Sequence, residues 1–336
     1  MLELRDVSRS LGREPILTGA RLDIPPNAPV AILGLGPASQ RDTLLKLLSG
    51  AERPQSGSIR LNGKDVAHVR RERGRIVRVG PGGAKLTGQR VGKLIGREAA
   101  ERVRLGARLD AAVNALDLDQ RIRLAIALAR AGRPSLILLD APGQELSLEI
   151  RERFLVDLKL MLADTSAVVV LTASTADEAR GLGGDVVVLH RGHILQTGSA
   201  ADVFARPANL AAALATSHPA LNTLVMMARE GCGVLADGSS FQPPDGMALP
   251  AEGACTLAFR PDDTMLERAS ASCLRFIVLA AGEESVAGRR FVRMTFAGSS
   301  WLTPQPAAAP PAGMVLNVFV DRARLMVFDA GGKAMA

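Results

Sequence analysis

Leu136-Ile-Leu-Leu-Asp140-Ala141-Pro142 carries the clearest structural pattern in the sequence. Four consecutive apolar residues that end in an acid predict a short strand buried on both faces, which is the pattern of a parallel sheet. Such a strand brings Asp140 to the carboxyl edge of the sheet, where open α/β folds bind their ligands. The stretch therefore predicts an α/β domain with a site near Asp140.

The segments around this stretch alternate between strand and helix patterns. The first ten residues alternate apolar and polar positions, as an edge strand would. Asp119 is the expected N-cap of one helix, and Gly132 its expected end. We expect strands at 30–33, 136–140, 167–172 and 185–190, and helices at 42–49, 119–130, 147–163 and 175–180. This alternation predicts a mostly parallel α/β sheet.

The pattern changes near residue 215. Helical periodicity gives way to short strands separated by Gly, Pro and Asp, which is typical of a small all-β barrel. The expected strands are 233–235, 255–259, 274–279, 291–296, 315–320 and 325–328. We therefore expect two domains, 1–215 and 216–336.

Composition limits the classes of protein to which the chain can belong. It has 336 residues, 47% of them apolar, which is enough for two domains with buried cores. No apolar run approaches the ~18–20 residues that cross a bilayer. The start of the chain lacks the apolar segment of a signal peptide, so we expect a cytoplasmic protein. The three cysteines, Cys232, Cys255 and Cys273, lack metal-ligand spacing and are expected to be reduced.

The charge balance is basic, with a formal net charge of +7. Such a charge is compatible with a nucleic-acid or anionic membrane partner. Aromatic residues, however, make up only 3% of the chain and include no Tyr, so platforms for stacking bases are scarce. The densest basic cluster, Arg70–Arg75, precedes the strand-like Ile76–Val79 and is expected to be a solvated turn. No nucleic-acid partner is expected.

Several segments carry a resemblance to a known family. Examples are Ser56-Gly-Ser-Ile-Arg-Leu-Asn-Gly63 and Leu124-Ala-Ile-Ala-Leu-Ala-Arg-Ala131, and others are 2–8, 43–50, 185–198, 202–209, 219–224, 259–263 and 328–334. In this order and spacing they resemble the ATP-binding subunits of carbohydrate and polyol ABC importers of the maltose, glycerol-phosphate and glycerol type, over essentially the whole chain. The resemblance implies an ABC-type nucleotide-binding domain, RecA-like with a mostly parallel sheet. It also implies an OB-like regulatory β-barrel of the TOBE type, and ATP and Mg²⁺ as cofactors.

The phosphate-binding loop departs from the family pattern. That pattern is G-x-x-x-x-G-K-[ST], in which bare backbone N–H groups, a Lys and a hydroxyl surround the phosphates. The resemblance places Gln40 at the second Gly, Arg41 at the Lys and Asp42 at the hydroxyl. The Asp42 carboxylate would repel a phosphate by about 4 kcal/mol at ~4 Å and an effective dielectric constant of ~20, and a guanidinium does not reproduce an ammonium. The degenerate nucleotide-binding positions are Gly36, Pro37, Ala38, Ser39, Gln40, Arg41, Asp42, Thr43, Pro81 and Asp140.

The other functional positions are altered as well. Ala141 stands where the family has the Glu that orients the attacking water, Ala173 where it has the γ-phosphate His, and Pro81 where it has the nucleotide-sensing Gln. The signature motif becomes Leu116-Asp117-Leu118-Asp119-Gln120, whose two carboxylates predict a well-capped helix and a poor anion site. Asp140 matches the metal-binding position, and its alternative interpretation is a structural cap at a strand end. No catalytic residue is intact.

The segment between Val91 and Leu116 is shorter than the helical subdomain that the family inserts there. Because that subdomain forms part of the groove for transmembrane subunits, we expect an altered docking face.

Three functions follow from these patterns. The leading hypothesis is a subunit of a sugar or polyol importer that does not hydrolyse ATP by itself. It would act in a heterodimer with an intact ABC ATPase, beside transmembrane permease subunits on the cytoplasmic face of the inner membrane. The alternatives are an active ATPase whose site is rebuilt around Arg41 and Asp42, and a regulator that binds an effector through its β-barrel. The transported substrate stays open.

Overall fold

The computed structural model describes residues 1–26, 28–34, 36–70, 75–86, 88–235, 238–243, 248–270, 272–286 and 288–335. The chain divides into two compact units, Met1–Arg206 and Pro207–Ala336. The division falls before residue 215, where the change of sequence pattern suggested a boundary. Helix α9 (Leu210–Ala215) belongs to the second unit, where Leu210 N–H donates to Gly332 O. Most of the basic cluster at Arg70–Arg75 lies outside the described residues, so its expected solvated turn stays a prediction.

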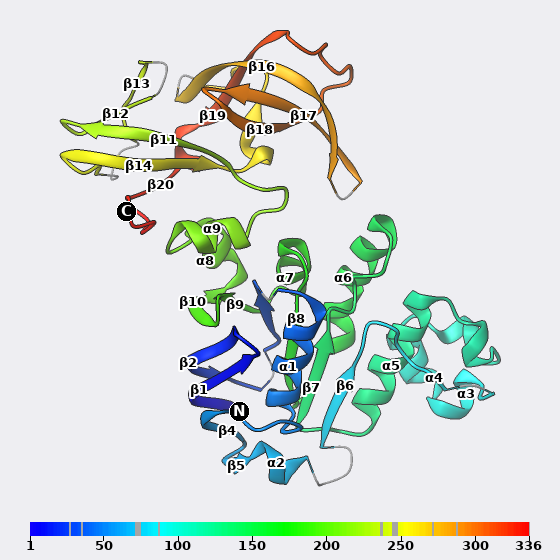
Figure 1. Ribbon diagram of the computed structural model, residues 1–336. Helices are drawn as coiled ribbons and strands as arrows, with labels where there is room; N and C mark the ends of the chain where they lie inside the picture. The colour runs from blue at the N-terminus through cyan, green and yellow to red at the C-terminus, as the bar shows by residue number, and fades with distance from the viewer. Residues whose placement is uncertain are drawn as a thin grey trace. The chain divides into compact units, whose positions relative to one another are not determined.

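A six-stranded sheet forms the centre of the first unit (Figure 1). Its strand order is β10-β9-β3-β8-β7-β6, with β9 and β10 antiparallel and the other neighbours parallel. Every residue of β3, β7 and β8 is buried, which explains why these strands are continuous apolar runs. The predicted parallel α/β sheet is confirmed. The strands are β3 (Val30–Leu33), β6 (Ile76–Val79), β7 (Leu136–Asp140), β8 (Val168–Thr172), β9 (Asp185–His190) and β10 (His193–Ser199).

Helices connect the parallel strands, as a right-handed α/β arrangement requires. The apolar face of α1 contributes Leu44, Leu45, Leu47 and Leu48 to one core cluster together with residues of β3, β7 and β8. The four expected helices are present, with ends shifted by a few residues, as α1 (Ala38–Leu48), α5 (Leu118–Ala131), α6 (Leu148–Leu162) and α7 (Ala176–Leu182). Two further helices, α2 (Val66–Val69) and α8 (Ala200–Ala205), were not predicted.

A smaller antiparallel sheet lies at the N-terminus, with the order β2-β1-β4-β5. The expectation that the first residues form an edge strand is wrong, because β1 pairs with β2 on one side and with β4 on the other. Alternation reports that one face of a strand is buried, and it does not report how many hydrogen-bonded neighbours the strand has. The strands are β1 (Leu2–Leu11), β2 (Glu14–Ile24), β4 (Ser56–Leu61) and β5 (Lys64–Asp65).

The described residues between β6 and α5 form short helices, and the shortening of the family's helical subdomain stays a prediction. These helices are α3 (Val91–Leu94), α4 (Arg97–Arg102), and the 3₁₀ turns η1 (Gly106–Arg108) and η2 (Val113–Ala115). Backbone hydrogen bonds from Val91 N–H to Ala111 O and from Val113 N–H to Gln89 O close the segment on itself. None of the helices in the described part of the chain combines the length and the apolar character that crossing a bilayer requires.

The second unit is rich in β-structure. Its described residues form two five-stranded sheets, β13-β12-β11-β14-β20 and β15-β19-β16-β17-β18. The two sheets share one apolar core cluster around Trp301 and Phe259. The strands are β11 (Asn222–Arg229), β12 (Cys232–Val234), β13 (Ser240–Phe241), β14 (Glu252–Phe259), β15 (Thr264–Met265), β16 (Cys273–Val286), β17 (Arg289–Phe296), β18 (Ser299–Pro304), β19 (Val315–Asp321) and β20 (Met326–Phe328), with 3₁₀ turns η3 (Pro261–Asp263) and η4 (Arg322–Arg324).

Candidate functional site

The loop between β3 and α1 begins with a glycine whose surroundings leave no space for a side chain. Gly34 has φ +88°, and a Cβ at this position would lie 1.9 Å from the carbonyl oxygen of Leu189 on β9. The close approach of the two backbones therefore sets where the loop starts. Leu35, the next residue, lies outside the described residues.

Replacing Gly34 by alanine is expected to destabilise the first unit more than the same change at Gly12. Both glycines have positive φ, but a Cβ at Gly12 would meet nothing within 4 Å. Both variants therefore carry the strain of a left-handed alanine, whereas Gly34→Ala adds a forced displacement of about 1–3 kcal/mol. Urea denaturation of the two variants measures the difference, and equal midpoints would contradict the close approach.

The loop is covered by a side chain of its own helix. The Gly36 backbone N–H donates to Oε1 of Gln40 over 2.9 Å. Helix α1 starts at Ala38 with Pro37 as its N-cap, and Pro37 makes no side-chain cap hydrogen bond. Gln40 thus places an amide oxygen where a phosphate-binding loop offers a free N–H group.

Arg41 and Asp42 are both held by neighbouring side chains. Arg41 is buried, and its Nη2 donates to Oε1 of Gln144 over 2.5 Å. Asp42 accepts from Lys46 over 2.8 Å and from Nη1 of Arg78 over 2.6 Å. Hydrogen bonds from Lys46 and then from Arg78 hold the pKa of the Asp42 carboxyl below its ordinary value. The Thr43 hydroxyl is occupied as well, since it donates to the Ser39 carbonyl over 2.9 Å.

Asp140 lies at the carboxyl end of β7, as the sequence predicts, and is 9% exposed. Its Oδ2 accepts from Nη2 of Arg78 over 2.5 Å, and its Oδ1 lies 3.7 Å from Nε of Arg41 and 3.4 Å from the Thr172 hydroxyl. Two guanidinium groups therefore face the carboxylate that the resemblance assigns to Mg²⁺. The residues present do not fit a divalent ion bridging Asp140 to a nucleotide.

The positions of the two missing reactive groups are filled by buried methyl groups. Ala141 is fully buried, with φ +40°, and its N–H donates to the Thr172 carbonyl. Ala173 is 2% exposed, and its N–H donates to Ile32 O over 2.9 Å. Pro81, just past β6, offers no backbone donor. Neither alanine can position a water molecule or contact a phosphate through its side chain.

The signature positions form the start of α5. Asp117 is its N-cap, accepting from Gln120 N–H over 2.8 Å, and the Gln120 side chain accepts from Asp117 N–H to complete a capping box. The expected N-cap at Asp119 is wrong, because Asp119 lies in the first turn and accepts from Nε of Arg123. Leu116 is buried ahead of the helix, and Leu118 is its first residue. The orphan N–H group of Gln120 is therefore satisfied by the chain itself.

Two residues of the site were not predicted from the sequence patterns. Arg78 connects Asp42 to Asp140, and Gln144 accepts from Arg41 and from the Ser174 hydroxyl at 3.3 Å. The one sequence signal for Arg78 is its position inside the apolar run Ile76–Val79 of a parallel strand. Gln144 carries no such signal, since it lies in the turn after β7.

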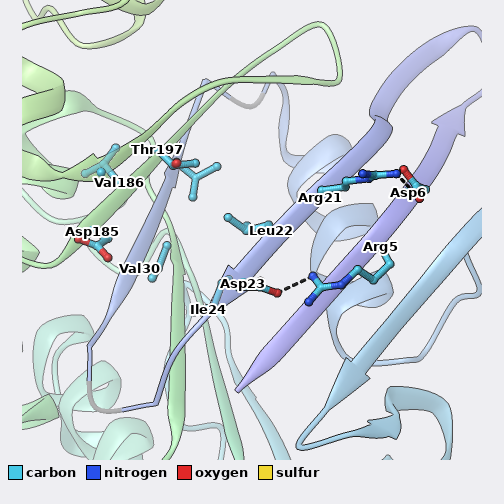
Figure 2. A pocket seen from close by; sticks show the side chains of 12 residues that line it. Arg5, Asp6, Arg21, Leu22, Asp23, Ile24, Val30, Asp185, Val186 and Thr197 are labelled. Atoms are coloured by element: carbon cyan, nitrogen blue, oxygen red, sulfur yellow. Dashed lines mark hydrogen bonds and ion pairs between the residues drawn. The ribbon is translucent and has the colours of Figure 1, made fainter.

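A separate groove of about 700 Å³ lies between β1–β2 and β9–β10 (Figure 2). Its lining includes Val30 and Asp185, the first residues of β3 and β9, which lie at the end of the sheet opposite to Asp140. Four of its charged side chains form two pairs, Arg5 with Asp23 over 2.5 Å and Arg21 with Asp6 over 2.6 Å. The groove does not belong to the site around Asp140.

Comparison with known proteins identifies the fold of the first unit. Residues 17–144 match the ABC transporter family model. The chain is 28% identical over 233 residues to the spermidine/putrescine import ATP-binding protein PotA of Legionella pneumophila, covering 64% of this chain and 63% of that protein. It is 27% identical over 225 residues to the Fe(3+) ions import ATP-binding protein FbpC of Escherichia coli, covering 62% and 64%. The chain thus matches less than two thirds of the length of either relative.

A solved structure agrees with this assignment. The cbiO1 subunit of Clostridium perfringens, part of the ABC transporter complex cbiONQ, superposes with a TM-score of 0.54 at 21% identity, covering 61% of this chain and 90% of that one. The first unit therefore has the nucleotide-binding fold of ABC transporters, and by sequence the chain is similar to the ATP-binding subunits of ABC importers.

Proposed function

We propose that the chain is an ABC-type subunit of an importer that does not hydrolyse ATP itself and that acts beside a second, intact ABC ATPase and transmembrane permease subunits. The observation that carries the proposal is the mutual engagement of Arg41, Asp42 and Asp140 with Arg78 and Gln144. Groups that bind phosphate and metal in an ATPase are here tied to one another. The ABC fold without its reactive groups supports a role in assembly.

The absence of a water-orienting side chain supports the same proposal. Loss of a general base or water-positioning group typically costs ~10²–10⁴ in rate. Ala141 removes the water-orienting group and Ala173 removes the group that contacts the γ-phosphate, and both alanines are buried. This argues against the alternative of an ATPase rebuilt around Arg41 and Asp42, since both of these residues already have partners.

The capping of α5 at the signature positions affects how a partner subunit could share a nucleotide site with this chain. In a shared-site dimer the partner's nucleotide would face Asp117 and Asp119, whose carboxylates disfavour a nearby phosphate. A groove of about 520 Å³ lies here, lined by both carboxylates and by Arg104, Arg123 and Arg153. These arginines are paired with Asp157, Asp119 and Glu149, so an intact partner is proposed to close on this face through groups other than the signature N–H donors.

The transported substrate is proposed only as a small solute. The sequence resemblance predicts a sugar or polyol, whereas the relatives are named for spermidine/putrescine and Fe(3+) ions. The second unit is proposed to be the TOBE-type regulatory barrel of the subfamily, which its two packed sheets support. Peripheral attachment to the cytoplasmic face of the membrane follows from the permease partners in this proposal.

Affinity purification from solubilised membranes tests the function. The tagged chain is expected to bring down permease subunits and a second ABC subunit with an intact G-x-x-x-x-G-K-[ST] loop. ATP turnover of that complex should be lost when the partner's catalytic Glu is changed to Gln, and the chain alone should show no turnover above buffer. A complex that contains only this ABC chain and still hydrolyses ATP would contradict the proposal.

A further inference from the structure

The Arg78 guanidinium lies between two carboxylates that come from different elements. Arg78 is on β6, opposite Leu138 of β7 in the parallel register. Its Nη1 reaches Asp42 on α1 over 2.6 Å, and its Nη2 reaches Asp140 at the end of β7 over 2.5 Å. One cationic group thus ties together a strand end and a helix start that are about a hundred residues apart in the sequence.

Two carboxylates that share one cation are the usual setting of a divalent metal ion. Mg²⁺ is commonly held by one or two carboxylates, with water or phosphate completing its shell. Here the bridging position is taken by the two terminal nitrogens of a guanidinium, which is always charged and has a planar fork that fits carboxylate oxygens. No group of three or more metal-ligating side chains occurs among the residues that the structure describes.

Gln40 similarly takes the place of a bound anion, because its amide oxygen accepts from a loop N–H group that would otherwise be free to contact a phosphate. Its Oε1 accepts the Gly36 N–H and would lie 2.5 Å from a Cβ placed on Gly36, which shows how closely the side chain covers the loop. Arg78 therefore occupies the position of the cation, and Gln40 accepts from the loop N–H group of Gly36 that would bind an anion.

We propose that Arg78 is an internal cation that takes the place of a bound divalent metal ion between Asp42 and Asp140, with Gln40 covering the adjacent loop. The site is then assembled without metal and without nucleotide. This inference concerns the isolated chain and stands whether or not the chain belongs to an importer complex.

Removing the guanidinium should create a metal site. In Arg78→Gln the carboxylates of Asp42 and Asp140 lose their shared partner, and Mn²⁺ should bind about tenfold tighter or more than in the wild-type chain. Lys46 and Arg41 remain beside the two carboxylates, at 2.8 Å and 3.7 Å, so the absolute affinity stays modest and the ratio between variants is the informative quantity. Titration of the free Mn²⁺ signal by electron paramagnetic resonance measures it.

Matched variants separate this effect from general loss of positive charge. Arg21→Gln removes an exposed arginine that pairs with the single carboxylate of Asp6, and it should bind Mn²⁺ as the wild type does. Arg78→Lys retains the cation and should also behave as the wild type. The double variant Arg78→Gln, Asp140→Asn should not show the increase in Mn²⁺ affinity that Arg78→Gln shows.

Two outcomes would overturn the proposal. The first is saturable Mn²⁺ binding by the wild-type chain, as tight as in Arg78→Gln and abolished by Asp140→Asn, because Arg78 would then give way to a metal ion. The second is an Arg78→Gln variant that folds but binds Mn²⁺ no more tightly than the wild-type chain. If that variant is partly unfolded, Mn²⁺ should raise its melting temperature but not that of Arg21→Gln, and failure of this rescue likewise overturns the proposal.

Discussion

Replacing Arg123 by alanine is expected to lower the free energy of unfolding of the first unit by about 3–5 kcal/mol. Arg123 and Asp157 are both buried, with Nη1 and Oδ2 3.0 Å apart, and Arg123 also pairs with Asp119 over 2.8 Å. Its guanidinium lies 5.6 Å from the centre of the Phe154 ring. The loss leaves the Asp157 carboxylate with only the largely exposed Arg104 as a partner, so the lower end of the range applies.

The control for Arg123 is Arg153→Ala, also on the α5–α6 face. Arg153 and its partner Glu149 are about three quarters exposed, so the change should cost no more than about 0.5 kcal/mol. Far-UV circular dichroism during urea denaturation follows mainly the first unit, because every described α-helix except α9 lies in that unit. Equal costs for the two variants would show that the buried ion pair does not stabilise this unit.

Replacing Trp301 by alanine is expected to destabilise the second unit by about 3–5 kcal/mol. Trp301 is fully buried, and its ring centre lies 5.0 Å from those of Phe259 and Phe276 and 4.8 Å from that of Phe296. Its Nε1–H donates to the Thr223 carbonyl over 3.0 Å. The truncation therefore opens a cavity in the only large aromatic cluster of the described core and removes the indole donor from the partly buried Thr223 carbonyl.

Trp301→Phe is the matched variant for this prediction. It keeps a ring in the cluster but loses the indole hydrogen bond and part of the volume, so a cost of about 1–2 kcal/mol is expected. Differential scanning calorimetry measures both variants without relying on tryptophan fluorescence. A melting temperature of Trp301→Ala equal to that of the wild type would refute the assigned packing.

The parallel sheet of the first unit could be predicted because its strands are buried on both faces. The runs at 136–140 and 185–190 are apolar for that reason, and their bounds match β7 and β9 closely. In the second unit β11, β13, β15 and β18 were missed. Strand β11 alternates buried and exposed residues, but Val225 and Met227 on its outer face are apolar too, and this hides the period of two.

The sequence indicated the individual positions of the candidate site, but it did not predict the contacts between their side chains. The sequence places Arg41, Asp42 and Asp140 near one another, because strand ends and the following loops meet at one edge of the sheet. It cannot show that Arg78 joins two of them, since that contact depends on the register between β6 and β7 and on where α1 begins. Local patterns report which face of an element is buried, whereas pairings across the fold follow from packing.

The purified chain is expected not to bind Mg-ATP at equilibrium. With Gln40 over the loop and Arg78 between Asp42 and Asp140, isothermal titration calorimetry should show no saturable binding at millimolar nucleotide. Saturable binding that requires Mg²⁺ and is lost in Asp140→Asn would contradict the claim that the chain fills its own nucleotide site.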